Sequence, residues 1–103
     1  MKHILAEAFE HEVMLSAIPV LLDFFTDGCA PCRSLAPILE QLEQERAGKL
    51  KVIQMDACQE AEFAARFHVM TVPTLLLFQH GRCVAQRSGL CNRKELQAWL
   101  DEA

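Results

Sequence analysis

The chain has 103 residues, of which 51% are hydrophobic and 23% charged, so it can bury one core, is too short for two and is too apolar to stay disordered. Its formal net charge of −4 and the absence of any Lys or Arg cluster leave out the attraction on which nucleic-acid binding depends. We therefore expect one soluble domain over residues 1–103, with no nucleic-acid partner.

The first elements predicted are a short edge strand over residues 2–5 and a helix. Phe9 and Val13 repeat at helical spacing beside Met14, and this helix should end before Pro19. The acidic residues of this region interrupt the stretch where a signal peptide would need an unbroken apolar run, and no segment reaches membrane-spanning length. We expect a cytoplasmic protein without a membrane partner.

Residues 18–25 form a nearly continuous apolar run, interrupted by Pro19 and Asp23. Such a run is typical of a strand buried on both faces, in the centre of a sheet with parallel partners. A helix should open near Cys29 and stop at Gly48, with Pro37 as an internal kink. Its apolar stripe consists of Leu35, Ile38, Leu39 and Leu42.

The second half predicts a strand over residues 50–55, a helix marked by Phe63 and Phe67, and a strand over residues 74–78. A turn at His80 and Gly81 should join that strand to another over residues 82–87, since both residue types tolerate positive φ.

The last predicted helix begins at Asn92, with Glu95 as its capping-box partner. Leu96, Trp99 and Leu100 should form its buried face. Together the elements predict an α/β fold with a mixed central sheet and helices on both faces.

Cys29 and Cys32 are separated only by Ala30 and Pro31 at the junction of strand and helix. A helix that starts there directs unpaired N–H groups and its positive dipole end at Cys29, which favours the thiolate. Cys29 is therefore the predicted nucleophile. Cys32, one turn deeper, is the predicted resolving thiol that attacks a mixed disulfide.

Asp23 is the second candidate catalytic residue, because an ionised carboxylate is costly to bury in an apolar strand. Burial should raise its pKa, so that Asp23 could take a proton from Cys32 and return it later. The alternative is a residue at a strand end that hydrogen-bonds to backbone, and spacing alone does not decide between the two.

Taken together, these motifs resemble the thioredoxin family over nearly the whole chain. The resemblance rests on a limited set of positions: Asp23, Phe24, Phe25, Cys29, Ala30, Pro31, Cys32, Pro37, Val72, Pro73, Thr74, Gly81 and Gly89. It implies a thioredoxin-like fold in which Cys29 attacks, Cys32 resolves and Asp23 is the buried acid beneath them.

The resemblance also implies a substrate-binding surface. Pro73 matches a cis-proline that faces the disulfide, Val72 should offer its backbone to an extended substrate strand, and Gly89 should leave room on the far wall. Gly28, Ala30 and Pro31 complete this surface, and Pro31 resembles the reducing branch of the family.

Three departures from the family pattern bear on partner choice and on reduction by an ordinary thioredoxin reductase. Gly28 stands where Trp is common and Ala30 where Gly is common, which removes docking surface. The Lys that often accompanies the buried Asp aligns with Val52, so we expect nothing to offset the desolvation of Asp23.

The remaining cysteines, Cys58, Cys83 and Cys91, are interpreted as small buried hydrophobes. Cys91 is expected to lie nearest the substrate surface, where it could form a regulatory or mixed disulfide. The four histidines have no metal-ligand spacing, so neither a metal nor a bound cofactor is expected.

The predicted function is reduction of protein disulfides by a monomer through a Cys29/Cys32 dithiol–disulfide cycle. Its partners would be disulfide-bearing proteins and a thioredoxin-reductase-like or other thiol donor. Two alternatives stay open: a noncatalytic binding or chaperone module, favoured by Gly28, and a metal or iron–sulfur carrier that uses the cysteine pair across a dimer.

Overall fold

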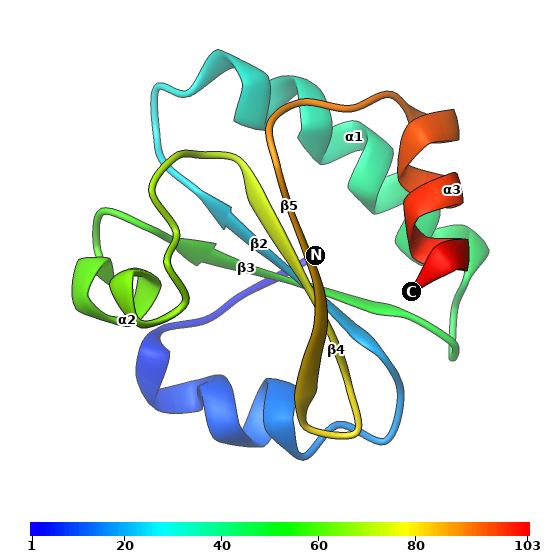
Figure 1. The fold of residues 1–103 in the computed structure, drawn as a ribbon, viewed down its shortest axis with the longest axis horizontal. Helices are drawn as coiled ribbons and strands as arrows, with labels where there is room; N and C mark the ends of the chain where they lie inside the picture. The colour runs from blue at the N-terminus through cyan, green and yellow to red at the C-terminus, as the bar shows by residue number, and fades with distance from the viewer.

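The computed structural model describes residues 1–103, as five strands, three α-helices and two short helical turns (Figure 1). In chain order the elements are β1 (Lys2–His3), η1 (Ala6–Ala8), η2 (Glu10–Met14), β2 (Val20–Phe25), α1 (Ala30–Glu45), β3 (Lys51–Asp56), α2 (Ala61–Arg66), β4 (Thr74–Gln79), β5 (Arg82–Ser88) and α3 (Arg93–Glu102).

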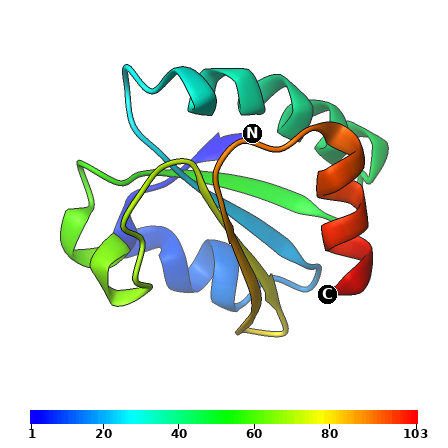
Figure 2. The ribbon, with the colours of Figure 1, turned by 45° about the horizontal axis from the view of Figure 1, so that its top comes forward.

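The sheet is mixed and has the strand order β1-β3-β2-β4-β5. β3 pairs in parallel with both β1 and β2, whereas β4 is antiparallel to β2 and to β5. α1 and α3 cover one face, and η1, η2 and α2 cover the other (Figure 2). The predicted α/β architecture is therefore confirmed, with β2 at the centre and β1 at an edge.

Side chains of β2 alternate between two separate cores, as the two-residue period of a strand requires. Leu21 packs with α1 and α3, whereas Leu22 and Phe24 pack on the opposite side. The core on that opposite side includes a cluster of aromatic rings from η1–η2, α2 and β4: Phe9, Phe63, Phe67 and Phe78.

The two longer helices contain the cap and the internal proline that the sequence predicts. Asn92 caps α3 by accepting from the Glu95 N–H at 2.8 Å, and Glu95 accepts from the Asn92 N–H at 2.9 Å, which confirms the capping box. Pro37 lies inside α1, where it has no N–H for the Arg33 carbonyl. The helix continues through it to Glu45.

The β4–β5 hairpin turns at His80 and Gly81, with φ of 52° and 75°. Both values lie in the left-handed region, as predicted for this turn. A Cβ on Gly81 would lie 3.2 Å from the Met14 carbonyl oxygen, so the hairpin tip packs closely on the end of η2.

Two details of the predicted elements were wrong. The N-terminal helix is divided into a 3₁₀ turn and a π-type turn, and Met14 is exposed on it. Trp99 packs against the core but is only partly buried, because α3 is a surface helix whose buried stripe is narrow. Ile38 lies on the predicted apolar stripe of α1 and likewise packs against the core. No helix combines the length and hydrophobicity that a membrane crossing needs.

Candidate active site

The cysteine pair lies at the N-terminus of α1. Cys29 is the N-cap residue in extended conformation, and its Sγ accepts from the Cys32 backbone N–H at 3.2 Å. Pro31 occupies the first turn, where its missing N–H costs no helical hydrogen bond. The backbone thus directs a donor and the positive end of a 16-residue helix at Cys29 Sγ, which would stabilise a thiolate there.

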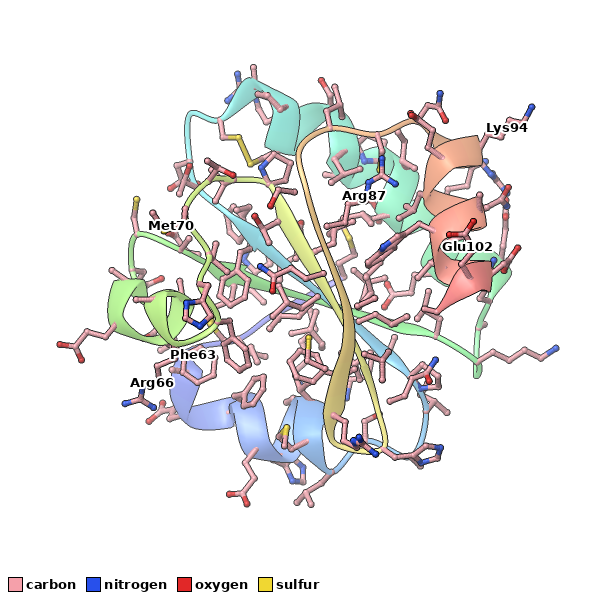
Figure 3. The ribbon with its side chains drawn as sticks, in the orientation of Figure 1. Phe63, Arg66, Met70, Arg87, Lys94 and Glu102 are labelled. Atoms are coloured by element: carbon pink, nitrogen blue, oxygen red, sulfur yellow. A yellow bond between two sulfur atoms is a disulfide. The ribbon has the colours of Figure 1, made fainter.

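Cys29 and Cys32 form a disulfide, with a Cα–Cα distance of 5.2 Å. It is visible as a yellow bond between two sulfur atoms beside the start of α1 (Figure 3). Cys29 is half-buried, whereas Cys32 is only 6% exposed. One sulfur of the pair can therefore meet a protein substrate, and the other is shielded behind it.

The loop before β4 lies against this disulfide. The Val72–Pro73 peptide bond is cis, as the resemblance implies, and Cys29 Sγ lies 3.9 Å from the Val72 carbonyl oxygen. The Gly89 N–H donates to the Pro73 carbonyl at 2.8 Å, which holds the end of β5 beside the loop. Gly89 has a φ of +91°, a conformation that side chains with a Cβ rarely adopt.

Beside Val72 lies an apolar cavity of about 270 Å³ that reaches α2. Cys58 and Met70 line it, and Met70 is 89% exposed (Figure 3). Sequence reasoning missed both residues. The available signal was that Cys58 follows the carboxyl end of β3, which lies beside the carboxyl end of β2 at the same sheet edge as the cysteine pair.

Asp23 lies within β2 and is 1% exposed. Its Oδ2 accepts from Gln54 Nε2 at 3.0 Å, whereas its Oδ1 has no hydrogen-bond partner. Burial raises the pKa of Asp23 from 3.8 to about 6, although the Gln54 hydrogen bond and the nearby His3 act in the opposite direction. The predicted rise in pKa is borne out, and the alternative of a backbone-bonded residue at a strand end is not.

The prediction that Val52 takes the place beside Asp23 was wrong. In the parallel pairing of β2 with β3, Val52 lies opposite Leu21, and Gln54 lies opposite Asp23. The error is a two-residue shift, which leaves the residue on the same face of the strand and so is not revealed by hydrophobicity. Gln54 therefore offsets part of the desolvation of Asp23.

The prediction for the three other cysteines was wrong for two of them. Cys58 and Cys83 are exposed, because Cys58 is in a loop and Cys83 is near the start of the edge strand β5, where successive residues are all exposed. Cys91 is 2% exposed and belongs to the core under α1 and α3, where burial raises its thiol pKa. Cys58, and not Cys91, is the additional cysteine that lines the cavity beside Val72.

No group of three or more His, Cys, Asp or Glu side chains is arranged to hold a metal ion. The site instead consists of a half-buried sulfur at a helix N-terminus, a buried sulfur one turn on, a cis-proline loop and a buried carboxyl group. This arrangement on a mixed sheet defines a thiol–disulfide oxidoreductase.

Comparison with known proteins agrees with that class. The family model described as Thioredoxin matches residues 1–102. Thioredoxin C-2 of Corynebacterium nephridii is 38% identical over 96 residues, which cover 93% of this chain and 89% of the relative. The thioredoxin of Haemophilus influenzae is 38% identical over 100 residues, with 97% and 94% coverage.

A third relative, the thioredoxin of Rickettsia bellii, is 34% identical over 95 residues, with 92% and 90% coverage. The chain belongs to the thioredoxin family. Family membership implies, in general terms, disulfide-bearing substrates and a reductase-type electron donor.

Proposed function

We propose that residues 1–103 act as one domain that reduces disulfides in other proteins. The observation that carries the proposal is the position of Cys29. It is half-buried at the N-terminus of α1, and its sulfur accepts a hydrogen bond from the Cys32 N–H. Because the helix end favours negative charge on that sulfur, Cys29 is the attacking nucleophile once the disulfide has been reduced.

In the first step the Cys29 thiolate attacks one sulfur of a substrate disulfide. A Cys29–substrate disulfide forms, the substrate S–S bond breaks, and the other substrate sulfur leaves as a thiolate that takes up a proton. Val72 and Pro73 would align the substrate chain next to Cys29, as supported by the 3.9 Å contact between Cys29 Sγ and the Val72 carbonyl oxygen.

The rest of the binding surface would come from the residues around this contact. Gly28, Ala30 and Pro31 flank the sulfur, and Gly89 lies beside Pro73. A Cβ placed on Gly28 would meet no atom within 4 Å apart from those of its two chain neighbours, so this side of the site is open to a partner surface.

In the second step Cys32 attacks Cys29 of the mixed disulfide. The Cys29–Cys32 bond forms, the Cys29–substrate bond breaks, and the second substrate thiol is released. Asp23 accepts the Cys32 proton and passes it to the departing sulfur. This role suits a carboxyl group that has a pKa of about 6 and one oxygen without a hydrogen-bond partner. Two electrons from a reductase-like or other thiol donor then restore the dithiol.

The proposed setting is the cytoplasm, where glutathione and reductases keep thiols reduced, with the protein acting as a monomer. The two exposed cysteines, Cys58 and Cys83, agree with a reducing compartment.

The test is insulin reduction, followed by turbidity with dithiothreitol as the electron source. Cys29→Ser should lower the rate to that of dithiothreitol alone, because no mixed disulfide can form. Cys83→Ser is the matched control, since Cys83 is an exposed cysteine at the hairpin end of β5, and this variant should retain the full rate.

If the unsubstituted protein is no faster than dithiothreitol alone, it is a noncatalytic binding module. The equilibrium potential of the Cys29/Cys32 couple in a glutathione buffer is the second measurement. A potential close to that of strong oxidants would contradict a reductase.

A further inference from the structure

A row of polar side chains crosses the sheet beneath α1. His3, Gln54 and Asp23 occupy matching positions on β1, β3 and β2, so all three project from the same face. His3 Nε2 lies 2.6 Å from Gln54 Oε1, and Gln54 Nε2 lies 3.0 Å from Asp23 Oδ2. The exposed imidazole of His3 is thus connected to the buried Asp23 through a single amide group.

The amide of Gln54 determines which atoms carry hydrogens along this row. An amide has a donor end and an acceptor end. Because the Nε2 end donates to Asp23, only the oxygen is left for His3, and His3 Nε2 must therefore donate. In both hydrogen bonds of the row the donated hydrogen therefore points in the direction of the Asp23 carboxyl group.

Without His3, the amide could turn by 180° and present its oxygen to Asp23. That orientation disfavours the ionised carboxylate and favours the protonated form, whose O–H can donate to the oxygen. We propose that His3 holds Gln54 with its N–H toward Asp23, and is thereby a positioning residue for the proton transfer at Cys32. This inference rests on the role proposed above for Asp23.

Gln54 also lies close to the cysteine pair. It lines a cavity of about 170 Å³ together with Cys32 and Asp27. A reaction at Cys32 therefore takes place within the same small space as the amide, while the Asp23 oxygen without a partner is free to receive the proton.

Other ionisable groups surround the row and are common to every variant tested below. Cys29 and Cys32, at the start of α1, form a disulfide in the oxidised protein and do not titrate there. Asp27 and Asp56 line the cavity at His3. On the other side, Leu75 of β4 separates Asp23 from Arg87 of β5, which lies in the same register row.

The experiment is a pH titration of the Asp23 carboxyl carbon by ¹³C NMR in the oxidised protein, with the resonance assigned by its loss in Asp23→Asn. His3→Ala should raise the titration midpoint by about half a pH unit or more, because the ionised form loses its oriented donor. Gln54→Leu should raise it at least as much. In the double variant His3→Ala should add little to the shift of Gln54→Leu, since only the smaller direct effect of the His3 charge remains there.

His11→Ala is the matched control, because His11 is an exposed histidine on η2 outside this row, and it should leave the midpoint unchanged. An unchanged midpoint in His3→Ala would overturn the proposal. So would a His3→Ala shift of equal size in the Gln54→Leu background, because His3 would then act directly by its charge.

The pH profile of insulin reduction separates this inference from the proposed function. In His3→Ala the profile should move to higher pH together with the Asp23 midpoint. If His3→Ala remains active and moves neither the Asp23 midpoint nor the pH profile, the role of His3 is contradicted and the proposed function is not. A moved midpoint in a protein without reductase activity contradicts the proposed reaction, since the titration of the oxidised protein requires no turnover.

Discussion

The two faces of the sheet are both buried, but they differ in chemistry. The face under η1, η2 and α2 is apolar apart from Thr74, which lies opposite Phe24, and Leu22 and Phe24 of β2 are fully buried in it. The face under α1 has the same apolar packing at Leu21, and then the polar pair Asp23 and Gln54 toward the cysteine end of the strands. Because the same strands supply both faces, the difference separates groups that hold the fold together from groups that serve the reaction in the proposed mechanism and cost stability when ionised.

The largest expected effect belongs to the apolar face. Phe24→Ala should lower the free energy of unfolding by about 3 to 5 kcal/mol, because it leaves a cavity beneath a ring that is 0% exposed. Urea unfolding of the oxidised protein measures this loss. Phe24→Leu, which fills most of the space, should lose much less, and a loss below about 1 kcal/mol in Phe24→Ala would mean that this face is not the main source of stability.

The opposite sign is expected for the polar face. The pKa of Asp23 is about 6 in the folded protein and 3.8 is its usual value, so between these two values the folded state holds more protons than the unfolded state. Stability due to this group is therefore complete below about pH 4 and is lost as the pH rises to about 6. Asp23→Asn should raise the free energy of unfolding by about 2 to 3 kcal/mol at pH 8.

This gain should vanish near pH 3, where Asp23 is protonated in the folded state and largely protonated in the unfolded state. Urea unfolding at the two pH values measures the difference. Asp27→Asn is the control, because Asp27 is exposed and should show no gain of this size. A gain that is equal at both pH values would contradict burial of charge as its cause.

The smallest expected effect on stability comes from a comparison of two cysteines. Cys91 lies in the core under α1 and α3, and Cys83 lies on the edge strand β5. Cys91→Ser should cost about 1 to 2 kcal/mol, since it places a hydroxyl without a partner at a position that is 2% exposed. Cys83→Ser should change stability by less than about 0.5 kcal/mol, because Cys83 is exposed. Thermal unfolding of both variants provides the comparison, and equal losses would refute the assignment of Cys91 to the core.

Much of the site could be predicted because its signals are local. Cys29 and Cys32 are one helical turn apart, so their spacing alone brings the two sulfurs together at a strand–helix junction. The capping box of Asn92 and Glu95 and the turn at His80 and Gly81 are also short-range patterns, and each occurs where it was predicted.

The predictions that failed depended on contacts between distant segments. Val52 and Gln54 are both compatible with a buried strand, and only the pairing of β3 with β2 places Gln54 beside Asp23. The exposure of Cys58 and Cys83 likewise depends on which elements cover them, and a small side chain such as cysteine occurs in either environment.

By itself the sequence determined the elements, the cysteine pair and the presence of a carboxyl group in a central strand, because hydrophobic period, helical spacing and capping act over a few residues. The tertiary structure alone decided that Gln54 contacts Asp23, that His3 is connected to it from the edge strand, and that Cys58 lines the cavity beside Val72. The physical reason is that strand register and layer packing join residues far apart in the chain. Gln54 is separated by 31 positions from Asp23 and by 51 from His3, and no local pattern encodes such a pairing.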